Sequence, residues 1–167
     1  HKISLSGSGN ILRYDTPSNL NDDDRDELWM VYNLTTYHTF NQYFSLQIPV
    51  NAYLTHIVYL LKTRSANNNW NRIFRIAPRL QYNPYKTFST TNTFEVLANY
   101  TAYDFEDQLT SVNSFSFRQF SFIDSSSLNI TKRIAFDWYN YIRLYERGEL
   151  NWKAFKGRPI NYFEDKT

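Results

Sequence analysis

Residues 44–54, FSLQIPVNAYL, alternate strictly between apolar and mostly polar side chains. Phe44, Leu46, Ile48 and Val50 fall on one side of an extended chain, because successive side chains of a β-strand point to opposite faces. The same two-residue period returns in segments 2–14, 28–39, 73–82, 93–103, 111–124 and 128–148. No segment has the 3.6-residue period of an amphipathic helix. The pattern predicts an all-β chain of about seven or eight antiparallel strands.

The two sides of these predicted strands differ in chemistry. The apolar positions that define one side are Phe44, Leu46, Ile48, Val50, Phe74, Ile76, Phe94, Val96, Phe136 and Trp138. The charged positions that define the other side are Arg75, Arg79, Glu95, Asp137 and Arg143. In a soluble sandwich the apolar side would pack inward, whereas in an outer-membrane β-barrel it would face lipid and the charged side would face the lumen.

Strand length and aromatic placement favour the barrel. Several segments exceed the about 9 to 11 residues that an inclined strand needs to cross a bilayer, whereas strands of globular proteins average about five or six. Aromatic residues near the predicted strand ends would suit the interfacial girdles of a membrane barrel. These candidate girdle residues are Trp29, Tyr43, Trp70, Tyr82, Tyr103, Tyr145 and Trp152.

Two positions predict irregular strands. Pro49 lacks a backbone donor, so its strand should lie at a sheet edge, carry a bulge or break there. In FSFRQFSF the register of phenylalanine changes between Phe117 and Phe120, which predicts a bulge at Arg118 and Gln119.

Composition narrows the class of protein further. The chain has 167 residues, which fits a single domain over 1–167, and its net charge of +2 argues against nucleic acid as a partner. Aromatic residues make up 19% of the chain, which favours strands. The chain has no cysteine, and no apolar run is long enough for a transmembrane helix. A mean hydropathy of −0.58 does not exclude a membrane barrel, whose apolar residues alternate with polar ones.

Five segments resemble consecutive strands and turns of bacterial outer-membrane β-barrel proteins, especially large barrels of the Bacteroidetes and Chlorobi type. They are FSLQIPVNAYL, SANNNWNRIFRIAPRLQYNPYKTF, TNTFEVLANYTAYDFED, NSFSFRQFSF and KRIAFDWYNYIRLYERGELNW. The resemblance covers roughly residues 26–165 and consists of patterns without a catalytic signature. It implies an antiparallel transmembrane β-barrel, or a large part of one, in the bacterial outer membrane. Membrane lipid is then the expected partner, together with other subunits or the remainder of a larger barrel.

The two ends of the chain depart from the pattern of such proteins. The chain starts without a signal sequence and stops at NYFEDKT, without the terminal aromatic residue of a final barrel strand. Two alternatives stay open: a small standalone barrel, and a segment of a larger one.

Candidate chemistry is sparse. The histidines His1, His38 and His56 belong to no metal-spaced motif, and neither a nucleophile elbow nor a phosphate-binding glycine loop occurs. We expect Asp104 to lie in a solvated strand end or loop and Glu95 to pair with an arginine. The sequence therefore predicts no enzyme, no cofactor and no metal site.

We expect a structural or porin-like, solute-passage role. The alternative is a soluble β-sandwich that binds carbohydrate by stacking sugar rings on exposed tyrosine and tryptophan.

Overall fold

The computed structural model describes residues 1–17, 23–105 and 112–150, and the backbone of Ile160–Lys166. Its strands are β1 (Lys2–Tyr14), β2 (Arg25–Thr39), β3 (Phe44–Tyr59), β4 (Asn69–Ile76), β5 (Arg79–Tyr85), β6 (Phe88–Tyr103), β7 (Phe115–Thr131), β8 (Ile134–Glu149) and β9 (Ile160–Lys166). A 3-10 turn, η1 (Ser65–Asn67), precedes β4. No helix within the described ranges is long and apolar enough to cross a membrane.

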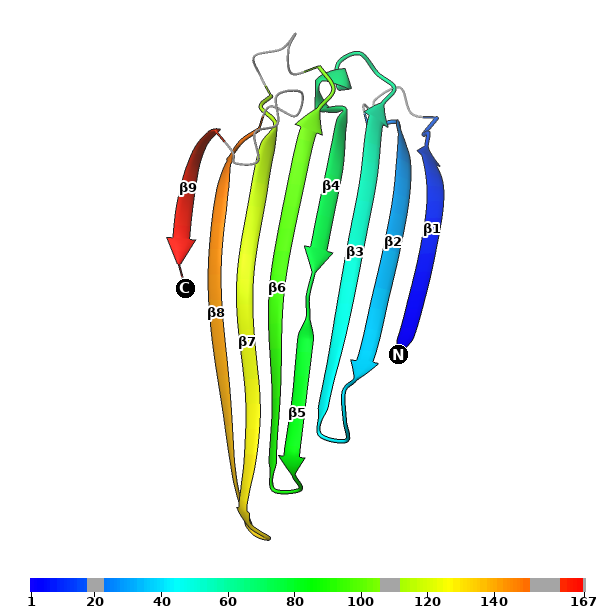
Figure 1. The fold of residues 1–167 in the computed structure, drawn as a ribbon. Helices are drawn as coiled ribbons and strands as arrows, with labels where there is room; N and C mark the ends of the chain where they lie inside the picture. Colours follow the sequence, from blue (N-terminus) through cyan, green and yellow to red (C-terminus); the bar gives the residue numbers. More distant parts are fainter. Residues whose placement is uncertain (18–22, 106–111, 151–159, 167) are drawn as a thin grey trace.

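All nine strands belong to one antiparallel sheet (Figure 1). The order across the sheet is β1-β2-β3-β4-β6-β7-β8-β9, and β5 continues the position of β4 between β3 and β6. Neighbours in sequence are therefore neighbours in space, as in a simple meander. The predicted all-β, antiparallel architecture is confirmed, with the strands filling eight positions across the sheet.

The connections differ in length at the two ends of the sheet (Figure 1). At one end, two to four residues join consecutive strands, at 40–43, 86–87 and 132–133. At the other end, nine to eleven residues separate β1 from β2, β3 from β4, β6 from β7, and β8 from β9. We call these the turn end and the loop end.

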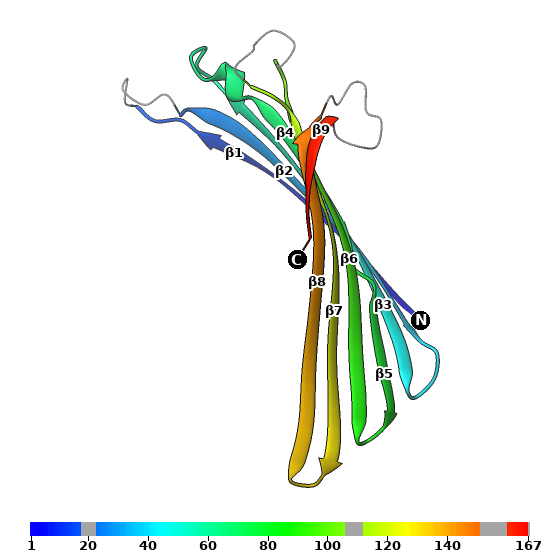
Figure 2. The same cartoon turned by 90° about the vertical axis from the view of Figure 1, so that its left-hand side faces the viewer.

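The sheet is one twisted, curved layer with two open edges (Figure 2). Within the described chain, β1 pairs only with β2, and β9 accompanies only the Leu144–Glu149 part of β8. Backbone groups along the outer side of β1 and along Ile134–Arg143 of β8 therefore have no strand partner among the described residues. The described strands therefore do not close into a ring.

Pro49 lies in a continuous central strand, so the prediction that its own strand is at an edge, bulged or broken is wrong. The interruption falls on the neighbouring strand instead, where Ala77 and Pro78 separate β4 from β5. The backbone nitrogen of Ala77 donates to the carbonyl of Pro49 at 3.1 Å. Because the N–H and C=O of one strand residue point to the same neighbour, the missing donor of Pro49 faces the gap between β4 and β5.

The predicted bulge at Arg118 and Gln119 is also wrong. Both residues pair in unbroken register with β6 and with β8. The two phenylalanines that suggested the bulge simply occupy opposite faces: Phe117 packs its ring 5.7 Å from that of Tyr145, and Phe120 points to the other side. Strand β7 continues through Ser125–Ser127, which lie between the predicted segments 111–124 and 128–148, and the turn falls at residues 132–133 instead.

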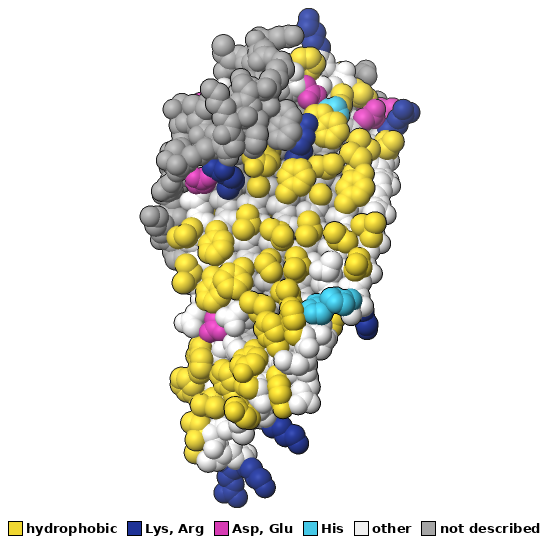
Figure 3. Space-filling view, viewed as in Figure 1, with side chains coloured by type: hydrophobic (Ala, Val, Ile, Leu, Met, Phe, Trp, Pro, Cys, Tyr) yellow, Lys and Arg dark blue, Asp and Glu magenta, His cyan; other side chains and the backbone are white. Residues whose placement is uncertain are grey.

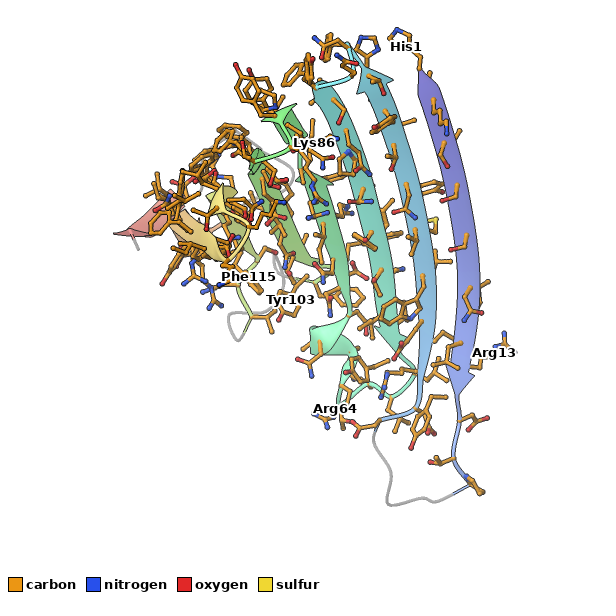
Figure 4. All side chains as sticks on the ribbon, turned by 90° about the horizontal axis from the view of Figure 1, so that it is seen from below. His1, Arg13, Arg64, Lys86, Tyr103 and Phe115 are labelled. Carbon is orange, nitrogen blue, oxygen red and sulfur yellow. The ribbon has the colours of Figure 1, made fainter. Side chains whose placement is uncertain are left out.

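The sheet has almost no buried apolar core. Among the described residues, only Ala77, Ala102 and Leu150 are buried apolar side chains. Figure 4, viewed from the turn end, shows side chains standing on both sides of the single layer. The candidate functional surfaces are therefore the two faces themselves.

Candidate functional site: the two faces of the sheet

Strand register assigns every described strand residue to one of two faces, because paired residues of antiparallel strands project to the same side. All ten predicted lipid-facing residues lie on one face, which we call the apolar face: Phe44, Leu46, Ile48, Val50, Phe74, Ile76, Phe94, Val96, Phe136 and Trp138. All five predicted lumen-facing residues lie on the opposite, polar face: Arg75, Arg79, Glu95, Asp137 and Arg143. Their contact with lipid or with a lumen stays a prediction.

An unbroken row of aliphatic and aromatic side chains crosses the apolar face from β1 to β8. We call it the apolar row: Leu5, Leu34, Val50, Ile76, Val96, Phe120 and Leu144, each paired with the next. The exposed fractions of these residues range from 37% to 77%. Figure 3 shows hydrophobic side chains gathered over the middle of this face, with Lys and Arg side chains mostly toward its two ends. The described part of the chain provides no cover for them.

The polar face carries a chain of side-chain hydrogen bonds one residue away from the apolar row. We call it the polar ladder, and its members are Ser6, Asn33, Asn51, Arg75, Glu95 and Gln119. Its centre is the ion pair of Arg75 and Glu95, with 2.7 Å between guanidinium nitrogen and carboxylate oxygen. The Asn51 amide donates to Asn33 at 2.7 Å. The prediction that Glu95 pairs with an arginine is confirmed.

The ladder joins six strands without a gap. Side-chain hydrogen bonds across strand pairs each contribute a few tenths to about 1 kcal/mol, and they specify register as well as stability. The sequence did not reveal the ladder, because its asparagines and glutamine are distant in the chain and meet only through strand pairing.

One carboxylate interrupts the apolar face toward the turn end. Asp124 accepts hydrogen bonds from Trp138 at 2.8 Å, Ser126 at 2.9 Å, and Thr90 and Asn140 at 3.1 Å each. We call these five residues the Asp124 cluster. Its donors come from β6, β7 and β8, so the carboxylate is satisfied within the sheet and costs less to hold on an apolar surface than an unpaired charge would.

The remaining charges of the apolar face are paired or lie near the loop end. Arg118 forms an ion pair with Glu146. His56 contacts Asp104 at 2.8 Å, and its ring stacks on Trp70 with 4.3 Å between centroids. Among the described residues no three His, Cys, Asp or Glu side chains form a group that could hold a metal ion.

The candidate aromatic girdle divides between the two faces. Trp70 and Tyr82 lie on the apolar face, whereas Trp29, Tyr103 and Tyr145 lie on the polar face. Tyr43 lies in the turn between β2 and β3. Trp152 lies outside the described residues. Of the candidates in the described strands, Trp70 and Tyr82 alone lie on the face where an interfacial girdle would meet lipid.

The geometry defines an amphipathic antiparallel sheet one layer thick, with the polar ladder across one face and an apolar face that no described residue covers. Comparison with protein-family models, with curated proteins and with solved structures finds no match to this chain.

Proposed function

We propose that this chain forms the wall, or a large part of the wall, of a β-barrel in the bacterial outer membrane. The apolar face meets lipid and the polar face lines the interior, through which solutes pass. The observation that carries the proposal is the apolar row, which spans seven strands and is exposed along its whole length. The function needs no catalytic group and no cofactor.

Lipid is the partner that best fits the apolar face. Each square ångström of apolar surface left in water costs about 25 cal/mol, and soluble monomers rarely expose large continuous apolar patches. Lipid tails remove this cost along the whole row at once. No further protein layer is then required to cover the apolar row.

The open edges support closure into a barrel. Unpaired backbone groups cost several kcal/mol each in hydrocarbon. The outer side of β1 and the Ile134–Arg143 part of β8 therefore need strands beyond the described pairing. The remainder of a larger barrel, or other subunits, would supply them.

The different lengths of the connections at the two ends of the sheet indicate how the proposed barrel would be oriented in the membrane. Outer-membrane barrels have short turns on the periplasmic side and longer loops on the outer side. By this criterion the turn end faces the periplasm. The main strands, such as β3, β6 and β8, are long enough to cross the bilayer and extend beyond it.

The direct test is extraction and gel mobility. We expect the protein to partition with outer membranes, to need detergent for solubility, and to migrate differently in gels before and after boiling, since a closed barrel resists unfolding by detergent at room temperature. Conductance steps after insertion into planar bilayers would then establish passage. A monomer that stays soluble without detergent would overturn the proposal.

That soluble outcome would favour sugar binding instead. Trp29 and Tyr53 are diagonal neighbours on the polar face and are 45% and 38% exposed, so their rings are available for stacking on a pyranose. A sandwich would need a second sheet over the apolar face, and the described strands all lie in one sheet. Titration with soluble oligosaccharides, followed by tryptophan fluorescence, would test this alternative.

A further inference from the structure

Positive charge exceeds negative charge on the polar face. The cationic residues that strands β1 to β8 place there are Lys2, Arg25, Arg75, Arg79, Arg143 and Arg147. The carboxylates placed there are Glu27, Glu95, Asp137 and Glu149.

Ion pairing removes two residues of each sign and leaves the excess of positive charge on this face unchanged. Glu27 is bound by Arg25, and Glu95 is bound by Arg75. These two carboxylates are thereby neutralised locally, and so are the two arginines that hold them. The central ion pair of the polar ladder contributes little net field to its surroundings.

Three arginines of the same face form no ion pair with any described residue: Arg79, Arg143 and Arg147. The guanidinium of Arg143 lies 5.2 Å from the ring of Tyr145, and that of Arg147 lies 4.7 Å from the ring of Phe115. The Nε of Arg143 is buried without a hydrogen-bond acceptor. Aromatic contacts hold Arg143 and Arg147 in place without supplying a counter-charge.

We infer that the polar face selects anions, and that Arg79 and Arg143 are the residues that set this preference. The inference rests on the proposed passage function and names the class of solute. Carboxylates, phosphates and chloride are attracted by the uncompensated cations, and cations are repelled by them. Arg79 lies one row from the ladder, and Arg143 lies in the same row as Glu95, so both are central to the face.

The physical mechanism is a positive potential inside the interior that the proposed barrel would enclose between low-dielectric walls. Such walls concentrate field lines and raise the local concentration of counter-ions. Guanidinium groups are weakly hydrated and present paired donors that match the oxygens of carboxylate and phosphate. Arginines that already hold a carboxylate cannot act in this way, which is why Arg75 is not part of the proposal.

The test is the reversal potential of the reconstituted protein across a potassium chloride gradient. We expect the unaltered protein to favour chloride over potassium. In the double variant Arg79→Gln with Arg143→Gln, the chloride-to-potassium permeability ratio should fall roughly two- to fivefold. The upper value corresponds to the about 1 kcal/mol between unit charges about 4 Å apart in water.

Three further variants make the result specific. Lys132→Gln removes the same charge from the turn between β7 and β8, outside the polar face, and should leave the ratio unchanged. Arg79→Lys keeps the charge and should keep the preference. Arg79→Gln alone changes an exposed, unpaired side chain, so it should fold even if the double variant does not, and it should shift the ratio in the same direction.

The outcomes separate this inference from the proposed function. Conductance without a chloride preference, or a ratio that Arg79→Gln leaves unchanged, would overturn anion selection and leave passage standing. A protein that inserts and never conducts would overturn passage and anion selection together.

Discussion

The two faces of this sheet are built from the same strands, and their central rows lie one residue apart. Leu34 follows Asn33 on β2, and Val96 follows Glu95 on β6, yet the two rows differ in whether their side chains find partners within the sheet. On the polar face, the ladder satisfies its side chains with one another. On the apolar face, every residue of the row remains exposed.

The difference shows what a single layer can and cannot supply. Hydrogen bonds and ion pairs act between neighbours on one face, so a row of polar side chains can be completed within the sheet. Burial of apolar surface requires a second body on the other side. Among the described residues, the apolar face is therefore the one that lacks a covering layer. In the proposed barrel, lipid would cover it.

The strongest test of the difference between the two faces places the same charge at neighbouring positions, one on each face. Ile48→Arg should lower the free energy of unfolding by about 2 to 4 kcal/mol if its side meets lipid near the bilayer midplane. Gln47→Arg should be milder, because its side chain lies on the polar face beside Tyr37, although repulsion from Arg79 on the neighbouring strand adds a small cost. Reversible unfolding by urea in lipid vesicles gives both values.

Equal costs at residues 47 and 48 would contradict the assignment of the two faces. A large cost at residue 47 alone would reverse it.

A second comparison tests whether the ladder is an energetic unit. Arg75→Gln should lower the free energy of unfolding by about 1 to 2 kcal/mol, because hydrogen bonds to charged groups are worth more than neutral ones and Glu95 loses its counter-ion. The side chain of Arg75 is 36% exposed, so solvent screening keeps the effect below that of a fully buried pair. Arg79→Gln, on the same face and without a partner, should stay within about 0.5 kcal/mol.

Urea unfolding curves of the two arginine variants and of Glu95→Gln provide the measurement. In a double-mutant cycle, Arg75→Gln and Glu95→Gln together should cost less than the sum of their separate costs. If the two costs in unfolding free energy were strictly additive, the ion pair of Arg75 and Glu95 would contribute no interaction energy of its own.

The division into faces was predictable from the sequence, whereas of the contacts within each face only the pairing of Glu95 with an arginine was predicted. Alternation is a local property, so residues such as Phe74 and Arg75 reveal their opposite sides by position alone. The neighbours of a side chain across the sheet depend on strand register, which one sequence does not display. The ladder and the Asp124 cluster therefore became visible only in the structure.

The failed local predictions have the same origin. Pro49 correctly indicated an irregularity in the sheet. The irregularity lies in the neighbouring strand position, between β4 and β5, which residue 49 faces. The change of phenylalanine register between Phe117 and Phe120 resembled a bulge. It reflects instead an aromatic partner, Tyr145, on the polar face.

The smallest expected effect compares two aspartates on opposite faces near the turn end. Asp124→Asn removes the charge that four side chains donate to, and its new amide group would face donors such as the Trp138 indole. We expect a loss of about 1 kcal/mol in unfolding free energy, the size of a typical hydrogen bond to a partly exposed group. Asp137→Asn should change little, because Asp137 is exposed and has no partner among the described residues. Unfolding in urea, with tryptophan fluorescence as the signal, measures both.

The aspartate comparison also bears on how the apolar face tolerates charge. If Asp124→Asn is neutral or stabilising, the carboxylate is a burden on a surface that meets lipid, and its four donors do no more than reduce that burden. If the loss is as large as expected, the Asp124 cluster joins β6, β7 and β8 in the way that the ladder joins strands on the polar face. Hydrogen bonds would then also connect strands on the apolar face, between the apolar row and the turn end.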